Sequence, residues 1–332
     1  MARRKKDDQL ALFAYEPEPE LDRKGVRPAE QPEEVEDLGR ELPKGIHLGG
    51  STWSFPGWAG LVYERTYPSS KLAREGLAAY ARHPLFRGVG IDRTHYTPVE
   101  AEELAEYRMA VPDEFRFLIK AHEACTLARY PDHARYGVQR GQVNPLFLDP
   151  AYAADQVVAP FVDGMGEDAG ALLFQFAPQS LGTAAQFAER LQRFLSALPR
   201  GPVYAVEVRN RELVTADYGE ALASVGACHC NNVHPRMPDI RAQAHLAGSE
   251  RGPMTIIRWL LGPGMTYEEA GTRYAPFNCM AAPDLANRQA VADLAREALA
   301  AGRPFLCTIN NNAEGCAPLS VVELAREIVR MP

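Results

Sequence analysis

Short apolar runs alternate with longer amphipathic segments eight times between residues 46 and 330, and this alternation limits the possible folds more than any other property of the sequence. The apolar runs have the length and β-branched content of buried strands, and the segments between them have the spacing of helices with one apolar face. Strands are expected at residues 46–53, 88–96, 115–122, 171–176, 203–209, 227–232, 254–259 and 304–311. Helices are expected at residues 71–83, 99–110, 151–165, 184–197, 216–224, 239–246, 283–300 and 319–329.

Strands that alternate with helices form parallel βα units, and eight such units predict an α/β fold with a single (β/α)8 TIM barrel over residues 46–330. A doubly wound open sheet is the alternative. It is disfavoured because no Gly-x-Gly-x-x-Gly motif or P-loop follows the first strand, where Gly49-Gly50-Ser51 is too short to count.

The expected strand at residues 203–209 carries two charges at its carboxyl end. Side chains alternate between the faces of a strand, so Glu207 and Arg209 share one face. Two charges in a buried segment are costly unless they pair with each other or meet a ligand. The strand therefore ends either in a structural ion pair or in part of a functional site.

Other expected strands also end in polar side chains, and in a TIM barrel these ends form the mouth that acts on ligands. We interpret Glu207 as the acid/base residue and Asp92 as the second choice. Lys120 is a third candidate catalytic residue, as an ion-pair partner or as a Schiff-base nucleophile if its neighbours lower its pKa. Candidate ligand-binding residues are Arg209, Arg258, Gln175, Asn310, Asn311, Trp53 and Tyr96. Since cations hold phosphate or carboxylate, the expected ligand is a small polar or anionic molecule.

No metal or other cofactor is predicted, because a metal site would need several histidine, aspartate or glutamate side chains that converge. A metal-assisted phosphodiesterase on the same barrel is left open through Asp92, His95, His122 and Glu207. Two connections, at residues 123–150 and 261–282, are long for this fold and rich in arginine and aromatic residues. They are expected to be binding loops or lids, or decorations of the rim.

Residues 1–45 are dense in charge and proline, so we expect a disordered tail before the barrel. One apolar island interrupts it, Gln9-Leu10-Ala11-Leu12-Phe13, which resembles the short peptide with which bacterial replication and repair proteins dock on the DNA sliding clamp. Gln9, Leu10, Leu12 and Phe13 are thus candidate partner-binding residues, and a DNA-repair protein recruited to the clamp is the second functional hypothesis.

The net charge of −7 argues against nucleic-acid binding through a broad basic surface, so nucleic acid is expected as a partner only after recruitment. No apolar run has the length of a signal-peptide core or a membrane span, and a cytoplasmic location without membrane contact is expected.

Six short motifs occur in the order known from one family. They are Gly49-Gly50-Ser51-Thr52-Trp53, Phe55-Pro56-Gly57-Trp58, the strand with Phe115, Phe117 and Lys120, Leu173-Phe174-Gln175-Phe176-Ala177-Pro178, the pair Glu207 and Arg209, and Ile309-Asn310-Asn311. By these motifs residues 46–330 resemble the YecE-like family, also called domain of unknown function 72. The resemblance implies a TIM barrel and no established substrate. The chain departs from the family pattern at Gly90-Ile91-Asp92 and at Arg258-Trp259-Leu260, where a glutamate and a histidine are missing.

Overall fold

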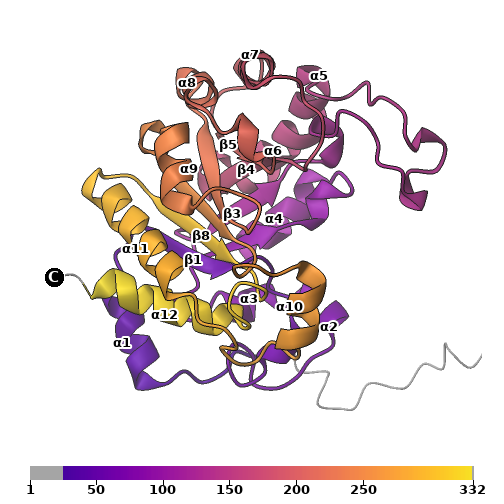
Figure 1. Cartoon of the computed structure of the whole chain (residues 1–332). Coiled ribbons are helices and arrows are strands. Elements are labelled where there is room, and N and C mark those ends of the chain that lie inside the picture. Colours follow the sequence, from indigo (N-terminus) through magenta and orange to yellow (C-terminus); the bar gives the residue numbers. More distant parts are fainter. Residues whose placement is uncertain (1–24, 331–332) are drawn as a thin grey trace, which may run out of the picture.

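The eight apolar runs of the sequence form eight parallel strands in the computed structural model, which describes residues 25–330 (Figure 1). Consecutive strands pair from β2 to β8, and β1 pairs with β8. The strands are β1 (Ile46–Gly50), β2 (Gly88–Ile91), β3 (Arg116–Lys120), β4 (Gly170–Phe176), β5 (Val203–Val208), β6 (Cys228–Val233), β7 (Thr255–Trp259) and β8 (Phe305–Ile309). The predicted (β/α)8 barrel is confirmed.

The seam between β1 and β2 is bridged by the side chain of Tyr80 and by a backbone hydrogen bond from the Arg87 amide to the Leu48 carbonyl at 2.9 Å. The Tyr80 hydroxyl accepts a hydrogen bond from the Gly50 amide at 2.6 Å and donates one to the Gly88 carbonyl at 3.1 Å. Gly49 comes so close to Gly88 that a Cβ at this position would lie 1.8 Å from the Gly88 carbonyl oxygen. The absence of a side chain at Gly49 therefore allows the first two strands to meet.

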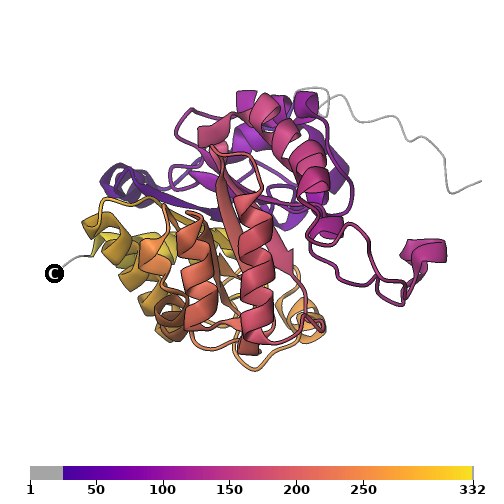
Figure 2. The same cartoon turned by 90° about the horizontal axis from the view of Figure 1, so that it is seen from above.

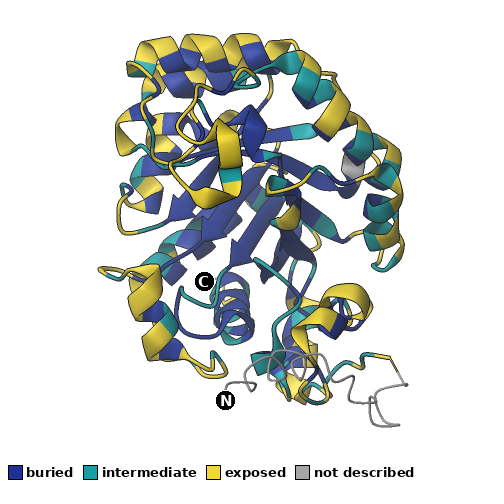
Figure 3. Ribbon diagram, turned by 90° about the vertical axis from the view of Figure 1, so that its right-hand side faces the viewer, coloured by how far each residue is buried: buried dark blue, intermediate teal, exposed yellow. Residues whose placement is uncertain are grey.

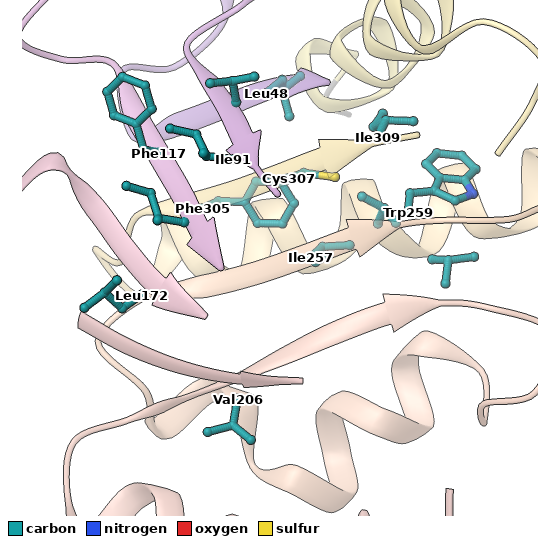
Figure 4. Close-up of a cluster of buried hydrophobic side chains, with 14 of the residues drawn as sticks. Leu48, Ile91, Phe117, Leu172, Val206, Ile257, Trp259, Phe305, Cys307 and Ile309 are labelled. Carbon is teal, nitrogen blue, oxygen red and sulfur yellow. The ribbon is translucent and has the colours of Figure 1, made fainter. Parts of the chain in front are cut away.

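Alternation along the strands divides their side chains between two apolar layers. The outer layer lies between the strands and the helices, and Figure 4 shows part of it, including Phe117, Val206 and Trp259. The inner layer fills the barrel and is smaller, with Leu118, Ala171, Leu173, Ala205, Cys228, Cys230, Met254, Ile256 and Leu306. On each of these strands, the residue two positions after the last apolar inward residue also points inward, and it lies nearer the carboxyl end of the barrel.

Helices surround the strands, with their exposed faces outward (Figure 3). They are α2 (Ser69–Glu75), α3 (Leu77–Tyr80), α4 (Ala101–Met109), α5 (Pro150–Ala153), α6 (Ala159–Met165), α7 (Ala184–Ser196), α8 (Ala216–Ser224), α9 (Ile240–Ala247), α11 (Leu285–Ala300) and α12 (Ala317–Val329). The predicted helix at 71–83 is divided at Gly76, and a π-helical turn lies between α5 and α6. Within the described part of the chain, no helix is both long and apolar enough to cross a lipid bilayer.

The prediction of disorder through residue 45 is wrong for the segment just before the barrel. Helix α1 (Glu33–Glu41) buries Val35 and Leu38, and Leu42 is buried directly after it. The Arg87 side chain ties down the end of this helix by donating hydrogen bonds to backbone carbonyls at Gly39, Leu42 and Pro43. These three apolar side chains are enough to order a segment rich in glutamate, because they lie on one face and pack against the barrel.

The two long connections differ in form. The connection after β3 projects from the barrel as an arm (Figure 2), in which Val138 and Val143 are exposed. The connection after β7 contains a further helix, α10 (Tyr267–Tyr274), whose Ala270 and Tyr274 are buried against Leu260 and Leu261. Loops that begin at the carboxyl ends of strands are in position to reach the barrel mouth.

Candidate functional site

A layer of polar side chains lies on the inner face of the barrel, one step beyond the apolar interior. Strand register sets Gln175 beside Glu207, and sets Arg258 beside both Asn232 and Thr308. The same alternation brings Asp92 and Lys120 inward from the ends of β2 and β3. Seven strands, β2 to β8, thus contribute polar groups to one end of the barrel.

Glu207 lies at the centre of this layer and is fully buried. One carboxylate oxygen accepts from the Nε atom of Arg209 at 2.6 Å, and the other accepts from a terminal nitrogen of Arg258, also at 2.6 Å. The same Arg258 nitrogen lies 3.1 Å from the side-chain oxygen of Gln175. Glu207 therefore holds two guanidinium groups in place with both of its oxygens.

These neighbours fix the charge of Glu207. Burial alone would raise the pKa of its carboxyl group, but the guanidinium groups of Arg209 and Arg258 lower that pKa to about 2. The Glu207 carboxylate in turn raises the pKa of both arginines, against the opposing effect of burial. A carboxylate this acidic carries no proton near neutral pH and is a weak base.

A second charged pair lies toward solvent. The Lys120 ammonium is 3.0 Å from one oxygen of Asp92, and a terminal nitrogen of Arg258 is 3.6 Å from the other. The Asp92 side chain is 43% exposed, whereas that of Lys120 is 9% exposed. Burial, and after it the charge of Arg258, lower the pKa of Lys120, while Asp92 opposes this. The pair thus combines a solvent-accessible carboxylate with an amine whose proton is held less firmly than usual.

Arg209 reaches from the buried layer to the surface of the mouth. Its side chain is 15% exposed, and its Nε atom is used by Glu207. Its two terminal nitrogens form no hydrogen bond with any residue from 25 to 330. Because Glu207 fixes the guanidinium from one side, these two nitrogens are oriented donors for a ligand.

His234 is a residue that the sequence reasoning missed. It directly follows β6, and its Nδ1 atom accepts a hydrogen bond from the Arg236 amide at 3.1 Å. Its position at the carboxyl end of β6 places it at the mouth, where burial, followed by the charge of Arg209, lowers the pKa of its imidazole. The only sequence signal is its position after the end of an apolar strand.

Several predicted ligand-binding residues have structural contacts instead. The Trp53 indole donates to the Leu72 carbonyl at 3.1 Å. Asn311 accepts from the Trp58 indole and from the Ala317 amide, so it joins the loop after β1 to the start of α12. The side-chain nitrogen of Asn310 donates a hydrogen bond to the Ser51 hydroxyl at 3.1 Å, and its side-chain oxygen accepts one from the Asn312 amide at 2.9 Å.

Tyr96 and the two histidines considered for metal binding lie beside the base of the arm. Tyr96 is exposed and lies under the guanidinium of Arg135. His122 contacts the Tyr152 hydroxyl at 2.6 Å, and His95 approaches Glu123. Asp92, His95, His122 and Glu207 therefore do not converge, and residues 25–330 contain no group of three or more histidine, cysteine or acidic side chains that could hold a metal ion.

The Glu207 ion pairs should make the free energy of unfolding depend on pH in the acidic range. The pKa of this group is lower in the folded protein than its ordinary value of 4.5, so the group stabilises the fold above that value, and this stabilisation is lost as the pH falls from about 4.5 to about 2. At roughly 1.4 kcal/mol per pKa unit, the loss is about 3 kcal/mol. Urea unfolding between pH 2 and 6 should show this loss of stability in the native protein but not in the Glu207→Gln variant. If the unfolding free energy of the two proteins changed with pH in the same way, the low pKa assigned to Glu207 would be contradicted.

The fold and the site define a class: a TIM barrel whose mouth is built on a buried carboxylate between two arginines. The pattern of the family described as "Protein of unknown function DUF72" matches residues 47–331, and the chain belongs to this family. The resemblance to the YecE-like family, which is the same family, is thereby confirmed.

Crystal structures of two members of the family have similar folds. A DUF72 family protein from Thermotoga maritima is 19% identical, with a TM-score of 0.59 over 85% of this chain and 98% of that one. A DUF72 family protein from Enterococcus faecalis is 17% identical, with a TM-score of 0.56 over 86% of this chain and 96% of that one. No curated protein matches the chain. At these identities the neighbours establish the shared barrel fold.

Proposed function

We propose that this protein is an enzyme that binds the phosphate or carboxylate of a small polar molecule at the barrel mouth and acts on it by acid/base chemistry. The observation that carries the proposal is the pair of terminal nitrogens of Arg209, which form no hydrogen bond within residues 25–330 and are held in place by Glu207. A guanidinium fixed in this way loses little conformational freedom when it forms a two-pronged contact with an anion. The negative net charge of the whole chain makes this local positive site more selective for small ligands than for a polyanion.

The proton-transfer role belongs to Asp92 rather than to Glu207. Both oxygens of Glu207 are occupied, and its low pKa leaves it without a proton to give. Asp92 is partly exposed, and it is 3.0 Å from an ammonium group that can exchange a proton with it. In this proposal Glu207 is a positioning residue, and Lys120 stabilises negative charge next to Asp92.

The proposal predicts that Arg209→Met weakens the binding of inorganic phosphate roughly tenfold to a hundredfold, since a hydrogen-bonded charge contributes about 1.5 to 3 kcal/mol. Arg209→Lys should recover part of the affinity, because it keeps the charge but not the two-pronged geometry. Isothermal titration calorimetry at a moderate ionic strength of about 0.1 M measures the dissociation constants.

Arg211→Met is the matched control, because Arg211 is exposed and only two residues away. It removes the same charge without changing the mouth, so it should leave phosphate affinity within about twofold, the screening limit for an exposed charge at moderate salt. Equal losses in the two methionine variants would mean that the effect is general electrostatics, and the proposed site would be abandoned.

Recruitment to a bacterial sliding clamp is a second proposal, and it rests on the sequence alone. Gln9, Leu10, Leu12 and Phe13 lie outside the described residues. A peptide with these side chains is expected to bind the clamp at micromolar strength, because a few apolar anchors must offset the ordering of the segment. Fluorescence anisotropy with a labelled peptide of residues 1–24 measures this. Undiminished binding after Leu12→Ala and Phe13→Ala together, or no binding at all, would refute it.

A further inference from the structure

The helix in the loop after β7 carries an aromatic side chain to the barrel mouth. Tyr267 begins α10, and it lies on the same side of the helix as Ala270 and Tyr274, since residues three and seven positions apart share a face. Ala270 and Tyr274 are buried against the barrel. Tyr267 lies on the same face about one turn before Ala270, at the start of the helix, and is 43% exposed.

The start of this helix is firmly held. Thr266 and Glu269 form reciprocal hydrogen bonds, in which the Thr266 hydroxyl accepts from the Glu269 amide and the Glu269 carboxylate accepts from the Thr266 amide. Such a capping box fixes the first turn. The exposed position of Tyr267 is therefore a property of an ordered turn.

Tyr267 and His234 come from different loops and meet at the mouth. Their ring centroids are 6.1 Å apart and their planes are inclined by 45°. The Tyr267 hydroxyl forms no hydrogen bond within the described chain. An aromatic ring that is half-exposed, next to a second ring, and without a partner for its polar group has the properties of a contact surface for a ligand.

His234 supplies a donor on the same side. Its Nδ1 atom accepts the Arg236 amide proton, so in the neutral ring the remaining proton is on Nε2. That atom contacts no acceptor among residues 25–330. Arg209 follows β5 and His234 follows β6, and these two strands pair in parallel, so His234 and the Tyr267 ring against it lie at the same end of the barrel as the guanidinium proposed to hold the anion.

We propose that Tyr267 and His234 form a subsite for a planar heterocyclic base beside the anion-binding Arg209, so that the ligand of the mouth is a nucleoside monophosphate. Arg209 holds the phosphate, and Tyr267 stacks on the base. The Nε2 proton of His234 is donated to an oxygen or ring nitrogen of the ligand. A phosphorylated sugar satisfies Arg209 equally well, but it has no π-face with which to use the exposed ring of Tyr267. This inference rests on the proposed function, because it requires the anion site at Arg209.

The test compares three kinds of probe by isothermal titration calorimetry on the full chain: inorganic phosphate, ribose 5-phosphate, and AMP, GMP, CMP and UMP. At least one nucleotide is expected to bind roughly tenfold to a hundredfold more tightly than ribose 5-phosphate, the range expected for stacking of one base on an aromatic side chain. Tyr267→Ala should remove this difference while leaving phosphate affinity unchanged. Tyr267→Phe should keep it, since the ring remains.

Thr272→Ala is the matched control, because Thr272 is an exposed residue on the same helix, and it should bind every probe as the native protein does. If phosphate and ribose 5-phosphate bind but no nucleotide binds more tightly, the base subsite is refuted and the anion site stands. The subsite is also refuted if the nucleotide advantage survives in Tyr267→Ala. If none of the probes binds, the anion site fails, and the subsite fails with it.

Discussion

Glu207→Ala is expected to lower the free energy of unfolding by about 3 to 5 kcal/mol, the usual effect of removing one partner from a buried ion pair. The loss is large because Arg258 is buried and cannot reach water to replace the carboxylate, and because the side chain of Arg209 is only 15% exposed. Their two positive charges would then repel each other in a region of low dielectric. Urea denaturation at neutral pH measures the change. Glu207→Gln should cost less, because an amide oxygen can still accept one hydrogen bond.

An exposed ion pair provides the control. Glu189 pairs with Arg193 on α7 at 2.9 Å, and both side chains are more than half exposed. Glu189→Ala should therefore cost only about 0.3 to 0.5 kcal/mol, as is typical of such pairs on a helix. If Glu207→Ala were no more harmful than Glu189→Ala, then Glu207 would not be the anchor of the two arginines, and the account of the site would be wrong.

Gly49→Ala is expected to destabilise the barrel strongly. The added Cβ would lie 1.8 Å from the Gly88 carbonyl oxygen and 2.7 Å from the Tyr80 hydroxyl. The strands β1 and β2 would have to separate, and the two hydrogen bonds of Tyr80 that close the seam would be lost. Overpacking typically costs about 1 to 3 kcal/mol and occasionally more. A cost at the upper end of this range is expected because the clash is with backbone, and the thermal midpoint or the soluble yield would show it.

Gly271→Ala adds the same methyl group where there is room. Gly271 lies inside α10, and a Cβ there would meet nothing within 4 Å. Alanine favours a helix over glycine by roughly 0.5 to 1 kcal/mol, so this variant should be unchanged or slightly more stable. Equal stability of Gly49→Ala and the native protein would show that the seam between β1 and β2 can open without cost.

The strands and the inward direction of the charged residues were predictable from the sequence because both follow from a period of two. Once β5 is recognised as a strand, Glu207 and Arg209 must share a face, and the carboxyl ends of parallel strands must meet. Asp92, Lys120 and Arg258 follow from the same rule. Helix α1 was not predictable in this way, because its apolar stripe is short and gains its stability from packing and from Arg87, which is distant in sequence.

The roles of individual residues depend on neighbours that a single sequence does not reveal. Glu207 has the residue type of an acid/base group, and only its contact with two arginines shows that it is held as a carboxylate. Asn311 has the residue type of a ligand-binding amide, yet it caps α12 and binds the Trp58 indole.

The most direct test of the central claim, that Glu207 orients Arg209 to hold an anion at the barrel mouth, is a crystal structure of the protein soaked with tungstate, an analogue of phosphate that is located by its anomalous scattering. The account predicts a tungstate peak within about 3 Å of the two terminal nitrogens of Arg209, at hydrogen-bond distance, and the loss of that peak in Arg209→Met. Tungstate bound only elsewhere, with the mouth of the native protein empty, would contradict it.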